Sequence, residues 1–208
     1  MEKPQIILTI TLVLIFIIGL FRYQTGFIKD LFFTAFLVVV LFLLYKHLKL
    51  TPVVYLLVCF SLLVHNMGAF SFYAPLFGIP YDNITHVLGL FSVTLMIANF
   101  FSFGFTKSRK LCTKDFVLFS MIFLAGLGIG ALVETMEYTG YLVWGQGEGF
   151  FQFGSGDYQE VNTTDKLTQI VGGGYFDTMD DLIHNIIGGA CAVALFGVNF
   201  FVFKKDYI

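Results

Sequence analysis

The sequence predicts an all-α fold, a polytopic membrane helical bundle of about six transmembrane helices that forms one integral membrane domain over residues 1–208. Of its 208 residues, 57% are hydrophobic and only 12% are charged, whereas a soluble domain carries about 25% charged residues. The mean hydropathy is +0.83, and phenylalanine alone occurs 27 times. Six apolar segments are each long enough to cross a hydrocarbon core of about 30 Å.

The six expected spans can be justified in chain order. The first follows the short head "MEKPQ" and precedes "FRYQTGF", which lacks the small-residue cleavage site of a signal peptide. Pro52 opens the third span, in the first turn, where a helix tolerates proline. Spans five and six are separated by a long glycine-rich loop, 140–176, with room for a lid or a short re-entrant element. The expected spans are 5–21, 28–46, 52–72, 82–104, 115–138 and 179–203.

The basic residues orient the bundle. Six spans place both termini on one side, together with the loops near 47–51 and 105–114. Nine of the twelve Lys and Arg residues fall on that side: Lys3, Lys46, Lys49, Lys107, Arg109, Lys110, Lys114, Lys204 and Lys205. Only Arg22, Lys29 and Lys166 fall on the other. Because cytoplasmic loops carry an excess of Lys and Arg, we expect a multi-pass protein of the cell (plasma or inner) membrane with both termini cytoplasmic and loop 140–176 outside.

Acids and histidines from four spans share one layer near the outer side. They are His65 in span three, Asp82 and His86 in span four, Glu134 and Glu137 in span five, and Asp177, Asp180, Asp181 and His184 in span six. A helix rises 1.5 Å per residue, so Glu134, twenty residues past Lys114, lies about 30 Å across the bilayer. Ionisable groups in a membrane are costly and face the protein interior or a wet cavity. The layer therefore predicts a common pocket.

Helix capping is the competing interpretation of these acids. Asp82, Asp177 and Asp180 open helices, where carboxylates cap backbone N–H groups and suit the helix dipole. Capping does not explain His86, Asp181 and His184, which lie deeper. It also does not explain Glu134 and Glu137, because acids are unfavourable at a helix C-terminus. His65 alone is more typical of a packing histidine. We favour a functional site for the set as a whole.

Small residues in spans five and six indicate close helix packing. Gly126 and Gly130 lie within "AGLGIGA", and Gly188 and Ala192 repeat the same spacing. Small residues four positions apart let membrane helices approach closely. We expect this contact to bring span five to span six.

Three stretches together resemble known membrane proteins: "YDNITHVLG", "ETMEY" and "DLIHNIIGGA", over about residues 80–192. Their order is similar to that of the VanZ-like proteins, which are linked to glycopeptide (teicoplanin) resistance. It is closer still to the YjdF-like family of predicted inner-membrane proteins. The resemblance implies shared positions at Asp82, His86, Glu134, Asp181, Asn185 and Gly188. His184 and the doubled acid Asp180–Asp181 depart from the VanZ-like pattern, and the resemblance implies a fold and a site but no reaction.

The residue types of the pocket indicate a cation. Acids and imidazoles without Lys or Arg make an electronegative pocket that repels phosphates and carboxylates unless a divalent metal inverts its charge. Mixed carboxylate and imidazole ligands suit Zn²⁺, Mn²⁺ or Fe²⁺. The expected metal ligands are Asp82, His86, Asp177, Asp180 and His184. The residues expected to carry the catalytic chemistry are Glu134, Glu137 and Asp181.

Three classes of function stay open. The first is a metal-dependent hydrolase or transferase that acts on a lipid or lipid-linked substrate at the outer leaflet. The second is a proton- or cation-coupled transporter. The third is a non-catalytic protein that binds lipid or acts in glycopeptide resistance. A transport path should continue to the cytoplasmic side, where the inner halves of the spans are rich in Phe, Leu, Val and Ile, so we favour the enzyme. The expected partner is membrane lipid, and no nucleic acid is expected.

Overall fold

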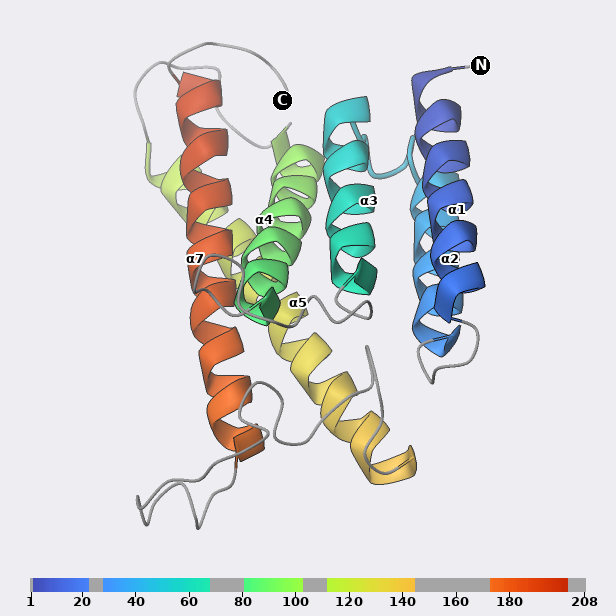
Figure 1. Cartoon of the computed structure of the whole chain (residues 1–208). Coiled ribbons are helices and arrows are strands. Elements are labelled where there is room, and N and C mark those ends of the chain that lie inside the picture. Colours follow the sequence, from blue (N-terminus) through green and yellow to red (C-terminus); the bar gives the residue numbers. More distant parts are fainter. Residues whose placement is uncertain (1, 23–27, 68–80, 103–111, 145–172, 202–208) are drawn as a thin grey trace.

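The computed structural model describes residues 2–22, 28–67, 81–102, 112–144 and 173–201. At residues 22, 28–30, 140–144 and 173–177 it describes the course of the chain but not the side chains. These parts contain helices and no strand, which confirms the predicted all-α bundle. The helices are α1 (Lys3–Arg22), α2 (Ile28–Leu43), α3 (Pro52–Met67), α4 (Tyr81–Phe101), α5 (Thr113–Trp144) and α7 (Gly173–Phe201). They alternate in direction along the chain (Figure 1).

Four of these helices are long and apolar enough to cross a membrane. The stretches are Lys3–Phe21, Tyr81–Phe101, Thr113–Thr139 and Thr178–Phe201. The apolar parts of α2 and α3 that the structure describes, Leu31–Leu43 and Pro52–Met67, are shorter. The helices follow the expected spans in order and approximate position.

The helix ends differ from the expected ones at three places. Helix α2 ends at Leu43, and turns follow in which Lys49 has a positive φ of 51°. Helix α5 continues to Trp144 and α7 begins at Gly173, so both extend into the segment expected as loop 140–176. The apolar run "YLVW" contains no helix breaker, and a glycine costs a helix only about 1 kcal/mol. The rest of that loop lies outside the described residues.

The helix starts have identifiable caps. Thr51 Oγ1 accepts a hydrogen bond of 3.2 Å from Val54 N–H, and Pro52 takes the first helical position of α3, as predicted. At the start of α5, the N–H of Cys112 donates to Asp115 Oδ2 at 3.2 Å. Asp115 is fully buried. Its carboxylate at this helix start is explained by capping.

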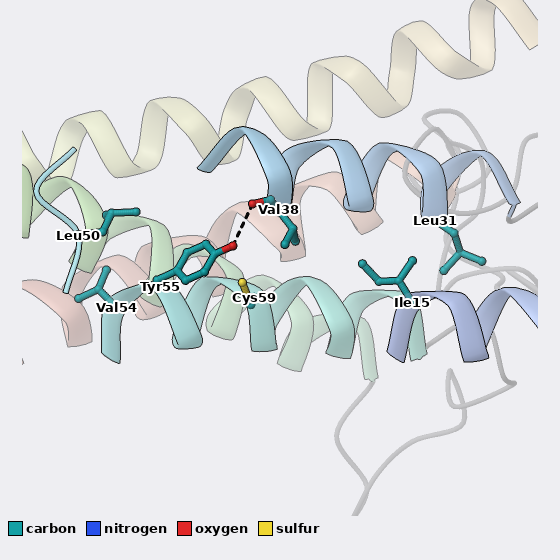
Figure 2. Packing of buried hydrophobic residues seen from close by; sticks show 7 residues of the cluster. All are labelled: Ile15, Leu31, Val38, Leu50, Val54, Tyr55 and Cys59. Carbon is teal, nitrogen blue, oxygen red and sulfur yellow. Dashed lines mark hydrogen bonds between the residues drawn. The ribbon is translucent and has the colours of Figure 1, made fainter. Parts of the chain in front are cut away.

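The helices pack as two groups of three. Helices α1, α2 and α3 enclose one core, in which the Tyr55 hydroxyl donates to the Val38 carbonyl at 3.1 Å (Figure 2). Helices α4, α5 and α7 enclose a second core around Leu95 and Ile122. Helices α3 and α4 join the groups. Ser61 and Ser92 share a hydrogen bond of 2.9 Å between their hydroxyls, and Tyr81 donates to the Val64 carbonyl at 2.6 Å.

The small residues of spans five and six were expected to pack these two spans together, but some of them contact α4 instead. A Cβ at Gly188 would overlap the carbonyl oxygen of Val87, so α7 lies directly against the backbone of α4. Gly126 likewise faces Thr94 of α4. Gly130, the other glycine of the expected spacing in span five, faces Asn185 of α7. Helix α4 is therefore the centre of its group, and it packs most extensively against α7.

Candidate functional site

The site is centred on His86, which lies one turn into α4. Its Nε2 atom lies 3.6 Å from Asp82 Oδ2 and 3.5 Å from Asp181 Oδ1. Asp82 and His86 share a face of α4 because they are four residues apart, and Asp181 comes from α7. One ligand atom from each of the three residues lies within 4.8 Å of the other two. We call Asp82, His86 and Asp181 the ligand triad.

The other ring nitrogen of His86 faces two further polar groups. Nδ1 lies 3.6 Å from Glu134 Oε1 of α5 and 3.3 Å from Asn185 Oδ1 of α7. A fourth helix also contributes, because His65 of α3 interacts electrostatically with Asp82 and His86. In Figure 1 the end of α3, the start of α4 and the start of α7 lie toward the same end of the bundle, as the shared layer predicted.

The group is buried in an acidic environment. The side chain of Asp181 is 3% exposed and that of Glu134 is 6% exposed. Asp82 is the most open member, at 21%. None of residues 52–67, 81–101, 116–144 and 173–201 is a lysine or an arginine. Over these described parts of the helices, the carboxylates therefore have only histidines as basic neighbours.

The remaining expected site residues take other places. His184 pairs with Asp180 inside α7: its Nδ1 lies 2.9 Å from the Asp180 carbonyl oxygen and 3.7 Å from Asp180 Oδ2. Neither residue belongs to the ligand triad. Glu137 lies three residues beyond Glu134 and is half-buried. The side chain of Asp177 lies outside the described residues.

Helix rotation explains this division. The buried residues of α7 include Asp181, Asn185, Gly188 and Ala192, a stripe with i, i+4, i+7 and i+11 spacing that faces α4. His184 precedes Asn185 by one position and is therefore turned by about 100° from it. Spacing among the acids and histidines alone did not single out Asn185 as a site residue, whereas the family resemblance implied that it is a shared position. The small residues of the same stripe are the signal that could have found it.

The comparisons with known proteins give one match. The family model described as "Predicted membrane protein (DUF2238)" matches residues 4–201. No curated protein and no solved structure matches the chain. The matching family is the one to which YjdF-like proteins belong, whereas a relation to VanZ-like proteins stays a prediction. Because the match covers nearly the whole chain, the protein belongs to the DUF2238 family of predicted membrane proteins.

Proposed function

We propose that the ligand triad binds a divalent transition metal and that the protein is a metal-dependent hydrolase or transferase. The substrate would be a lipid or a lipid-linked molecule at the outer face of the membrane. One observation carries the proposal: a single nitrogen, Nε2 of His86, faces two carboxylates from two helices at 3.6 and 3.5 Å.

Those two distances fit shared coordination better than direct hydrogen bonds. An N–H···O hydrogen bond has a usual length of about 2.9–3.0 Å. A tetrahedral zinc ion binds nitrogen and oxygen at about 2.0–2.2 Å, which places neighbouring ligand atoms about 3.4 Å apart. The separations of Nε2 from Asp82 and Asp181 are close to the second value. The two separations at Nε2 therefore suit neighbouring ligands of one ion, and the ligand atoms of Asp82 and Asp181 lie within 4.8 Å of each other.

The composition of the triad also suits a catalytic metal. One imidazole and two carboxylates are ligands for Zn²⁺, Mn²⁺ or Fe²⁺. Carboxylates this close in a low-dielectric layer repel each other, and a cation removes that repulsion. Three protein ligands leave a position open for water or substrate, as catalytic zinc sites do. When bound, the metal would supply an activated water or polarise the bond under attack.

The residues around the triad take separate roles in this proposal. In this proposal Asp181, which the sequence placed among the catalytic residues, serves as a ligand, and Glu134 lies at the opposite nitrogen of the ring. Glu137 is half-buried near the end of α5, and in this proposal it keeps the catalytic role expected from the sequence, as a general acid or base. One divalent ion does not neutralise three carboxylates, so an uncharged reacting group such as a lipid ester or amide fits better than a phosphate.

Elemental analysis of the full chain purified in detergent tests the metal. We expect about one transition-metal ion per chain. Ligand binding to the folded state at 100 times Kd adds about 2.7 kcal/mol of stability, so a chelator should lower the melting temperature and Zn²⁺ should restore it. The proposal would be contradicted by protein that is purified without metal and whose melting temperature changes with neither the chelator nor Zn²⁺. Protonation of the carboxylates would then explain how they are accommodated in the bundle.

Coupled transport is the second candidate, and a buried polar series on α4 favours it. Ser92, Thr94 and Asn99 are all buried and lie beyond the site toward the far end of α4. The inner half of this helix is thus less apolar inside the bundle than the sequence indicated. Proton or cation flux into liposomes that is lost in Asp181→Asn would favour this function. The non-catalytic binding role is supported only by the resemblance to VanZ-like proteins.

We also propose that both termini are cytoplasmic and that the site opens to the outside, on the basis of the distribution of Lys and Arg. In a background without Cys59, Cys112 and Cys191, a Ser155→Cys variant should react with a membrane-impermeant maleimide on intact cells. A Lys107→Cys variant should react only after permeabilisation. The reverse pattern would invert the topology.

A further inference from the structure

We propose that Glu134 and Asn185 are positioning residues that hold the proton of His86 on Nδ1 and so present Nε2 to the metal. The inference rests on the proposed metal site and adds the groups that orient its only imidazole ligand. A neutral imidazole carries one proton, and the hydrogen bond at one nitrogen decides which nitrogen can bind a metal.

The atoms that face Nδ1 are both acceptors. Glu134 Oε1 lies 3.6 Å from Nδ1 and Asn185 Oδ1 lies 3.3 Å from it. A carboxylate and an amide oxygen both accept hydrogen bonds, and so do the two carboxylates that face Nε2. When a metal takes the lone pair of Nε2, Nδ1 is the nitrogen that keeps the proton and donates it. The ring of His86, carried by α4, is thus contacted at Nδ1 from α5 and from α7.

The packing at Gly130 fixes the place of the Asn185 amide. A Cβ at Gly130 would lie 2.9 Å from Asn185 Nδ2 and 3.1 Å from its Cγ. The amide therefore occupies the space that a side chain at residue 130 would need. Gly130 and Glu134 are four residues apart and share a face of α5. One face of α5 thereby admits the Asn185 amide and supplies the carboxylate beside it.

The consequence is that the proton of His86 has two acceptors at Nδ1 when Nε2 binds a metal. With the proton on Nδ1, the lone pair of Nε2 points to the side where Asp82 and Asp181 lie. Hydrogen-bond partners of this kind fix the tautomer of metal-binding histidines, and their loss typically weakens metal affinity about 10–100-fold.

Metal titration of two variants at one position tests the role. Asn185→Leu removes the acceptor and should weaken Zn²⁺ and Co²⁺ binding about 10–100-fold. Asn185→Asp keeps an acceptor at Nδ1 and should bind within a few-fold of wild type. Asn66→Leu is the matched control: Asn66 is as buried as Asn185, at 4% each, and donates to Thr34 of α2 at 2.7 Å. That variant should keep wild-type affinity.

A readout without metal separates this inference from the metal proposal. In protein labelled with ¹⁵N-histidine and assigned with His86→Gln, the His86 ring should show a proton on Nδ1. Asn185→Leu should shift protons toward Nε2, and Asn185→Asp should not. Wild-type protein with Nδ1 unprotonated would overturn the inference, as would equal metal affinity in all three proteins. Correct tautomers in protein that never binds metal would overturn only the proposed function.

Discussion

A His86→Ala variant is expected to lose its bound metal while the helical bundle persists. His86 supplies the only imidazole of the triad, and its Nε2 is the atom that both carboxylates face. Without it, two carboxylates from α4 and α7 are left facing each other, with too few ligands for a tight transition-metal site. We expect affinity for Zn²⁺ to fall by at least the 10–100-fold that loss of a hydrogen-bond partner alone produces. Elemental analysis and isothermal titration measure the change, and circular dichroism monitors the helices.

Two further histidines provide the controls. His47 is exposed just beyond α2, so His47→Ala should bind metal like wild type. His184→Ala should weaken binding much less than His86→Ala, because His184 is hydrogen-bonded within α7 and is not in the triad. If His184→Ala removes the metal and His86→Ala does not, the ligand assignment is wrong.

A Gly188→Ala variant is expected to destabilise the bundle strongly. The added Cβ would overlap the Val87 carbonyl oxygen and lie 3.1 Å from the Phe91 amide nitrogen. Both are backbone atoms of α4, so only a movement of whole helices relieves the overlap. Overpacking in a core typically costs about 1–3 kcal/mol, and we expect the upper part of that range. Thermal unfolding in detergent measures the loss.

Gly89→Ala is the matched control on the partner helix. An added Cβ at Gly89 meets no atom within 4 Å, and alanine favours a helix over glycine by about 0.5–1 kcal/mol. This variant should therefore melt at the wild-type temperature or slightly above it. A Gly188→Ala protein that is as stable as Gly89→Ala would show that α4 and α7 are not in backbone contact.

The helices could be predicted from the sequence because long apolar runs leave few alternatives in a membrane. Their ends could not be predicted as well. Hydropathy falls at Thr139 and Gly140, yet the backbone of α5 continues to Trp144, because a short polar or glycine interruption costs a helix only about 1 kcal/mol and does not end it. The expected start of α7 at 179 was late for the same reason.

The site was predictable in depth but not in rotation. Counting residues along a helix gives the height of a side chain, and it placed His86, Glu134 and Asp181 in one layer. It does not show how each helix is rotated about its own axis, and therefore which of its side chains face the neighbouring helices. That angle is set by contacts such as Gly188 on Val87, which direct Asp181 and Asn185 to His86 and leave His184 to the side. The role of Asn185 depends on a neighbour ninety-nine positions away, and local spacing cannot reveal such a pair.

The length of α5 links the site to the surrounding lipid. Between Asp115 and Glu134 it has eighteen uncharged residues, 116–133, about 27 Å of helix, which is close to the hydrocarbon thickness of about 30 Å. Figure 1 shows α5 lying obliquely across the bundle, and the tilt of a membrane helix adjusts when bilayer thickness changes. Gly130 and Glu134 lie at the end of this uncharged stretch, so we expect the contacts at Nδ1 of His86 to respond to bilayer thickness.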